Sequence, residues 1–148
     1  MSTLAVGLAG CDNNLFQGPL AVRESYGGLE IAVCTSGSTD EVVAYESARS
    51  ADERWSEFLR ASGELALTAG TIIVPAREMR GLQMQEYVRP HLTGGSELDI
   101  SVNLDDSAVA SALFLIPDGG LPIASWLQPD GTVTTSPCRV VTSTTQDN

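Results

Sequence analysis

The sequence predicts an all-β fold, an antiparallel β-sandwich with one short helix or helical turn near residues 50–60. Apolar and polar residues alternate along several short runs, which is the period of a strand with one buried face. Glycine, proline and aspartate separate these runs at short intervals, as turns do in sandwiches. The 148 residues are enough for one ordinary domain.

We divide the chain into an N-terminal arm at 1–20, a sandwich at 21–120 and a C-terminal extension at 121–148. The first 20 residues are nearly uncharged and rich in small side chains, so they are expected to act as an arm. "LAGC", ending at Cys11, resembles a lipid-attachment box, but a signal peptide needs basic residues and an unbroken apolar stretch before it. No other segment has the length of a membrane span, and no membrane partner is expected.

Three runs in the first part of the body predict strands. "GGLEIAVCTSG" places Leu29, Ile31 and Val33 on one face between glycines, and "ELALTAGTIIVP" supplies another strand or two, broken at Gly70. "LQMQEYVRPHL" follows, with the even-numbered residues from 84 to 88 expected on one face and the odd-numbered ones on the other.

The next two runs predict a hairpin. "ELDISVNLDD" alternates strictly, so it is expected to have one face in the core and one in water. "AVASALFLIP" is apolar on both faces up to Pro117, which indicates a strand covered by the core and by a neighbouring segment or another subunit. Residues 105–107 between them have turn character.

The helix is expected from "SARSADERWSEFLRASG". Ser50 and Glu53 resemble a capping box, and Trp55, Phe58 and Leu59 have helical spacing. Gly63 is expected to end the element.

The charge balance excludes one class of partner. Nineteen acidic residues oppose eight basic ones, giving a formal net charge of -11. Such a surface repels phosphates, so no nucleic acid is expected as a partner. The basic residues are all arginine, which reflects codon usage or favours bidentate carboxylate contacts.

The metal-ligating residue types do not form a recognisable site. The cysteines, Cys11, Cys34 and Cys138, are odd in number and far apart, which argues against a zinc site and against a disulfide framework. Reduced cysteines are therefore expected. The acidic pairs in "STDE" and "NLDDS" lack EF-hand spacing and suit turns. No metal or other cofactor is expected.

Residues 75–95 hold the side chains that most resemble an active site. His91 is a candidate base, but no nucleophile elbow or zinc-protease motif accompanies it, so no catalytic residue and no enzyme is expected. Arg77, Arg80 and Arg89 are candidate contacts with an acidic partner, with internal ion pairs as the alternative.

In order, the segments resemble those of the jelly-roll capsid cement, or decoration, proteins of short-tailed bacteriophages. The motifs are "DNNLFQGPLAV", "GGLEIAV", the run ending at Pro75, the Arg80–Gly81 turn and the strand around Tyr87–Arg89. The likeness covers residues 12–120. It departs from the family pattern in the extra residues between Pro75 and Gly81, in Pro90 and in the segment after Gly120.

The resemblance implies that the sandwich is a jelly roll or a related form. It also implies a structural virion protein on the outer surface of a phage head, made in the host cytoplasm. Its implied partners are the major capsid protein and itself, as a homo-oligomer such as a dimer or trimer. The candidate capsid or subunit contacts are Leu4, Val6, Leu8, Leu15, Phe16, Arg77 and Arg80.

Two other functions stay open. A carbohydrate- or receptor-binding sandwich would use Trp55, Trp126 and Tyr45 as exposed stacking platforms. A small hydrolase would use His91 together with a carboxylate or serine in a pocket.

Overall fold

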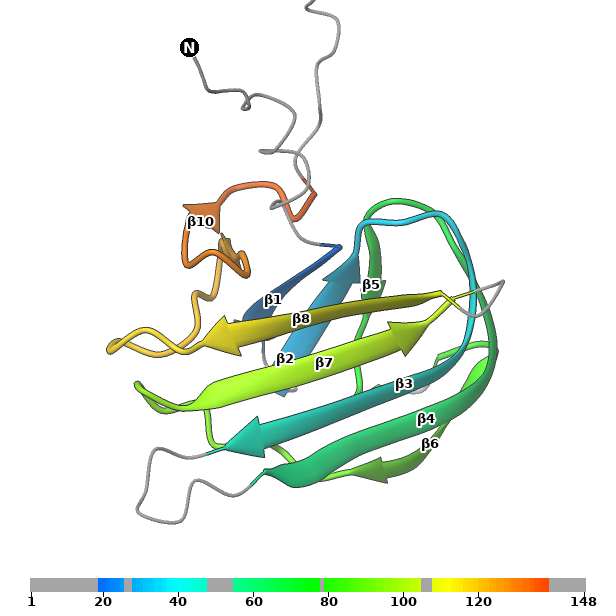
Figure 1. The fold of residues 1–148 in the computed structure, drawn as a ribbon, viewed down its shortest axis with the longest axis horizontal. Helices are drawn as coiled ribbons and strands as arrows, with labels where there is room; N and C mark the ends of the chain where they lie inside the picture. Colours follow the sequence, from blue (N-terminus) through cyan, green and yellow to red (C-terminus); the bar gives the residue numbers. More distant parts are fainter. Residues whose placement is uncertain (1–18, 26–27, 48–54, 78, 105–107, 139–148) are drawn as a thin grey trace, which may run out of the picture.

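The described part of the chain forms two antiparallel sheets of five strands each (Figure 1). The computed structural model describes residues 19–25, 28–47, 55–77, 79–104 and 108–138. The first sheet has the order β10-β9-β1-β2-β5, and the second has the order β6-β4-β3-β7-β8. The predicted antiparallel β-sandwich is therefore confirmed, whereas the jelly-roll topology stays a prediction. Within the described ranges there is no helix long and apolar enough to cross a membrane.

The strands of the first sheet are short. They are β1 (Leu20–Ser25), β2 (Gly28–Val33), β5 (Thr71–Ile73), β9 (Trp126–Leu127) and β10 (Val133–Thr134). The second sheet has the longer strands, which are β3 (Gly37–Ser47), β4 (Ser56–Leu67), β6 (Leu82–Tyr87), β7 (Glu97–Asn103) and β8 (Val109–Leu115). The hairpins β1–β2, β3–β4 and β7–β8 join strands that are consecutive in the chain.

The core lies between the two sheets and is built from alternating side chains, as predicted. Leu29, Ile31 and Val33 of β2 are fully buried, and so are the apolar residues at every second position of β7. Phe58 and Phe114 are the largest side chains of this core. Because a period of two puts every second side chain on one face, the sequence pattern alone identified the inner faces of both strands.

The predicted helix is wrong where the structure describes it. Residues 48–54 lie outside the described residues, and β4 begins at Ser56. The partner of Ala44 is Leu59 and that of Tyr45 is Glu57, so Phe58 is an extra residue in a β-bulge. Phe58 and Leu59 are consequently both buried, and this break in the alternation imitates helical spacing.

The predicted faces of β6 are also wrong. Arg60 pairs with Glu86 and Ala61 pairs with Met84, which leaves Gln85 as a second bulged residue. After the bulge Tyr87 packs against the same core as Met84, whereas Glu86 is exposed. A bulge inserts one extra residue, so each residue after it lies on the opposite face from the one that strict alternation predicts.

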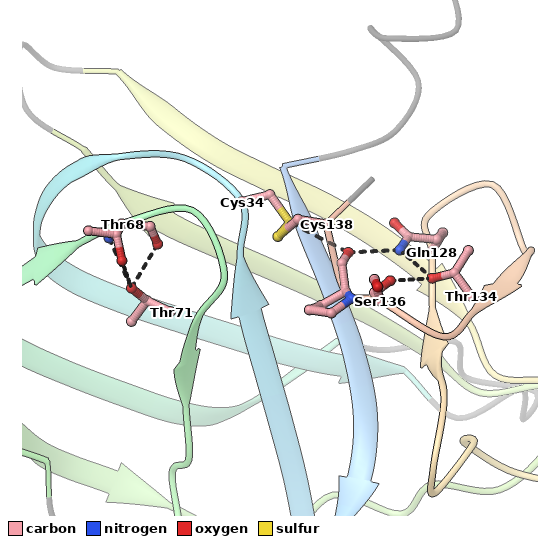
Figure 2. Close-up of a disulfide and its surroundings, with 8 residues drawn as sticks. Cys34, Thr68, Thr71, Gln128, Thr134, Ser136 and Cys138 are labelled. Atoms are coloured by element: carbon pink, nitrogen blue, oxygen red, sulfur yellow. Dashed lines mark hydrogen bonds between the residues drawn. A yellow bond between two sulfur atoms is a disulfide. The ribbon is translucent and has the colours of Figure 1, made fainter. Parts of the chain in front are cut away.

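The segment after Gly120 continues the first sheet. Leu127 pairs with Val22 of β1 and with Val133 of β10. The buried Gln128 donates hydrogen bonds from Nε2 to Thr134 Oγ1 at 3.0 Å and to the Pro137 carbonyl oxygen at 2.9 Å (Figure 2). These contacts hold the chain close to the end of β2.

A disulfide joins Cys34, directly after β2, to Cys138 (Figure 2). The expectation of reduced cysteines is therefore wrong, because the two residues are separated by 104 positions in the sequence but meet through the β10-β9-β1-β2 ladder. Pairing leaves Cys11 as the remaining cysteine of the chain.

Candidate functional site

The segment from Arg77 to Gly81, the Arg77–Gly81 loop, connects β5 to β6. The Arg77 amide donates to the Val74 carbonyl oxygen at 2.9 Å, and the Glu64 amide donates to that of Gly81 at 2.7 Å. A β-bridge links Met79 to Leu82. Glu78 lies outside the described residues. Both ends of the loop are thus fixed by backbone hydrogen bonds, so its exposed arginines project from an ordered support.

The loop borders a hollow of about 810 Å³. Arg77 and Arg80 both line it, together with apolar side chains that include Met79, Met84 and Pro75. Gly63 of β4 lines the hollow as well. A hollow lined by guanidinium groups and apolar side chains can hold a partner side chain that has both a carboxylate and a hydrocarbon stem.

Gly63 was missed in the sequence, where it was expected to end a helix. It lies inside β4 with a φ of +140°, and a Cβ at this position would collide with the carbonyl oxygen of Gly81. A glycine inside a strand often marks a close approach of two backbones, and this is the signal that could have placed it beside the loop.

Arginines elsewhere in the described ranges form ion pairs within the chain. Arg23 Nε lies 2.8 Å from Glu30 Oε1, and Arg89 Nη2 lies 3.4 Å from Glu24 Oε2. Arg60 binds the carboxylates of Glu41 and Glu57. By contrast, Arg77 and Arg80 form no ion pair with any residue that the structure describes. Internal ion pairs therefore account for three of the described arginines. Arg77 and Arg80 remain candidates for a contact with another protein.

Arg60 organises the exposed face of the second sheet. Its Nη1 lies 2.8 Å from Glu41 Oε2 and its Nη2 lies 3.0 Å from Glu57 Oε1. The hydrogen bond from Arg60 lowers the pKa of Glu57, and that carboxylate in turn raises the pKa of Arg60. Hydrogen bonding with Glu57 raises the pKa of the neighbouring Glu86. The charged groups of this cluster interact with one another, so Arg60 is not available to bind a carboxylate of another protein.

The candidate contacts of the N-terminal arm, Leu4, Val6, Leu8, Leu15 and Phe16, lie outside the described residues. The structure therefore brings together Arg77 and Arg80 and leaves the apolar candidates as predictions.

His91 has a carboxylate neighbour but is not enclosed. Its Nδ1 lies 3.4 Å from Glu46 Oε2, and its backbone amide donates to Glu46 Oε1 at 2.9 Å. The imidazole is 80% exposed, and it lines neither the hollow beside the loop nor a second hollow near Arg23 and Ile123. This environment fixes the position of the segment after Pro90 without forming a closed site around the ring.

The three aromatic residues considered for sugar stacking are not equivalent. Trp126 is 2% exposed and packs against Ala21 and Ala32, with the Arg23 guanidinium 4.3 Å from its ring centroid. It is therefore a buried residue and not an exposed platform. Trp55 is 44% exposed and Tyr45 is half-buried.

Metal ligands and relatives add no further candidate. Among the residues that the structure describes, no three His, Cys, Asp or Glu side chains are grouped so that they could hold a metal ion. Comparisons with protein-family models, with curated proteins and with solved structures found no match.

Proposed function

We propose that the protein is a capsid cement protein, which binds the outer surface of a bacteriophage head and stabilises the shell by bridging neighbouring capsid subunits. The observation that supports this most is the pair of arginines on the Arg77–Gly81 loop, which have no ion-pair partner among the described residues of an acidic chain. We assign the loop as the contact with acidic groups of the major capsid protein.

The physical argument starts from the charge. A chain with a formal net charge of -11 offers each arginine many internal carboxylates, and three described arginines use them. Guanidinium groups left without such a partner are free for bidentate contacts with carboxylates of another protein. Backbone hydrogen bonds at both ends of the loop reduce the conformational entropy that binding would cost.

The assembly multiplies a modest contact. A single loop with two arginines is a small interface, but a shell fixes the relative positions of many copies, and a homo-oligomer engages several sites together. Apolar residues of the N-terminal arm, such as Leu4, Val6 and Leu8, are proposed to add contact area. The exterior of a released particle is also an oxidising setting, in which a disulfide such as Cys34–Cys138 persists.

Attachment to undecorated heads tests the proposal. The double variant Arg77→Ser/Arg80→Ser should co-sediment with heads at least about tenfold more weakly, because a charge-assisted hydrogen bond contributes about 1.5–3 kcal/mol. Binding of the wild type should fall as salt is added. Deleting residues 1–11 tests the arm in the same assay and should also weaken attachment.

Arg89→Gln is the matched control. It removes one exposed guanidinium that already has an internal partner, Glu24, so attachment should stay close to that of the wild type. If the wild type does not co-sediment with heads at saturating concentration, the function is wrong. If the Arg77/Arg80 variant binds as tightly as the wild type, the assignment of the loop is wrong.

A further inference from the structure

We propose that two copies of this chain associate through β8, edge to edge and antiparallel, so that their second sheets form one continuous sheet. The inference concerns association in solution and does not depend on binding to a capsid. Its starting point is that β8 is the end of the order β6-β4-β3-β7-β8 and pairs only with β7 among the described strands.

The backbone groups of β8 show which residues face the free edge. The Leu104 amide donates to the Ala108 carbonyl oxygen, and the Ile116 amide donates to that of Ser96, so both ends of the hairpin are hydrogen-bonded pairs. In an antiparallel ladder such pairs alternate, so even-numbered residues of β8 bond to β7. The amides and carbonyls of four residues then point to the open edge: Val109, Ser111, Leu113 and Leu115.

The same residues carry the exposed apolar side chains. Val109, Leu113 and Leu115 are 55%, 50% and 52% exposed, although alternate residues of the strand pack into the core. Soluble proteins usually protect a sheet edge with charge, proline, a bulge or a very short strand. From Val109 to Leu115 there is no charged residue and no proline, and the pairing with β7 is regular.

The other sheet edges of the described strands are protected. β5 and β10 have three and two residues, and β6 contains Glu86 and the bulge at Gln85. β8 is therefore the least protected sheet edge among the described strands.

A second copy fits this edge by symmetry. With a two-fold axis at Ala112, all seven residues of β8 pair, Val109 faces Leu115 of the partner subunit and Ser111 faces Leu113 of the partner subunit. The small Ala112 then meets its own copy at a non-hydrogen-bonded position, where backbones approach most closely. The pairing buries the apolar outer side chains of both strands against each other.

The acidic residues of β7 do not oppose this pairing of two acidic chains. Glu97 and Asp99 of β7 lie opposite Leu115 and Leu113. Across the proposed junction the two β7 strands would be about 14 Å apart, three strand spacings, which is beyond the Debye length at physiological salt. The acidic side chains of the two β7 strands would therefore repel each other only weakly.

Sedimentation of the full chain over a wide range of concentration tests the interface. The wild type should reach twice the monomer mass of 15.6 kDa. Ser111→Pro removes one amide from the open edge and spares the β7 ladder, so it should shift the protein to the monomer without loss of β-sheet circular dichroism. Leu113→Lys should also shift the protein to the monomer, because it places a charged side chain in the apolar junction. Ile123→Lys is the control, because it alters a 71% exposed apolar residue outside β8.

Cysteine cross-linking tests the register. In a Cys11→Ser background, Ala112→Cys should form a disulfide-linked dimer on oxidation, whereas Ala108→Cys should not, because its copies would lie far apart along the strand. A wild type that stays monomeric, a trimer, variants that remain dimeric, or cross-linking at residue 108 and not at 112 would each overturn the proposal. If the first 18 residues of the same chain cover the edge of β8, the wild type will be monomeric, and this result also overturns the proposal.

Discussion

At the scale of single residues, the ion pairs divide the arginines into two groups. Arg60 contacts Glu41 and Glu57, and the short distances show why its guanidinium is held on the sheet surface. Arg77 and Arg80 have no such partner in the described ranges, although acidic residues outnumber basic ones in the chain. The number of acidic residues therefore does not decide which arginines are neutralised, because ion pairing needs the right position as well.

Replacing Glu86 by glutamine should raise the melting temperature at neutral pH. The pKa of Glu86 is raised above 4.5 by its contact with Glu57, so the ionised form is disfavoured in the folded state. This contribution to stability is fully present below the unfolded pKa and is lost as the pH rises through the folded pKa. Glu86→Gln stays neutral at every pH, and its amide can still donate to Glu57.

Thermal melts at neutral pH and well below pH 4.5 check this prediction. The variant should be more stable at neutral pH and equal to the wild type in acid. Glu64→Gln removes the same charge from an exposed position nearer the other end of β4 and serves as the control for net charge. An equal gain in both variants would contradict the local explanation.

At the scale of elements, glycines set the contact between β4 and the Arg77–Gly81 loop. Gly63 and Gly81 both have positive φ, and a Cβ on either one would strike a backbone carbonyl of the other segment. This close approach leads the chain from the loop into β6 and so places Arg80 beside the hollow.

Three glycine-to-alanine variants distinguish the free-energy cost of a positive φ from that of a steric collision of the added Cβ. Gly81 and Gly70 have the same φ of +99°, but a Cβ would meet nothing within 4 Å at Gly70. Gly70→Ala should cost about 1–2 kcal/mol for the left-handed conformation alone, and Gly81→Ala should cost clearly more. Gly119→Ala has neither problem and should change stability by less than about 0.5 kcal/mol. Denaturant unfolding measures all three, and equal losses at Gly70 and Gly81 would refute the collision.

At the scale of the whole molecule, the disulfide ties the C-terminal segment to the sandwich. β9 pairs with the central strand β1 at one residue pair, Val22 with Leu127, so the ladder alone holds this segment weakly. Cys34–Cys138 and the hydrogen bonds of Gln128 supply the remaining restraint.

Removing the disulfide should lower the free energy of unfolding by about 3–5 kcal/mol, since it closes a loop of about 100 residues in the unfolded chain. Denaturant unfolding of the wild type with and without a reductant measures this effect. The double variant Cys34→Ser/Cys138→Ser should match the reduced wild type and should not respond to reductant. The same midpoint for oxidised and reduced wild type would contradict the prediction.

The sequence by itself determined the strands whose burial is regular. The alternation at Ile100 and Val102, and that at Leu29 and Ile31, was enough to predict strands and their buried faces, since a period of two is a property of the local backbone. It also singled out Arg77 and Arg80. Its prediction that the run 108–117 is covered on both faces does not hold within one described chain, because Val109, Leu113 and Leu115 on the outer face of β8 are about half exposed.

Tertiary structure alone decided the rest. The bulges at Phe58 and Gln85 exist only relative to partner strands, so local periodicity suggested a helix in one case and the wrong faces in the other. The pairing of Cys34 with Cys138, the internal partners of Arg60 and the open edge of β8 depend on which distant segments become neighbours. Strand order is fixed by the packing of the whole chain, and no single stretch of sequence contains that information.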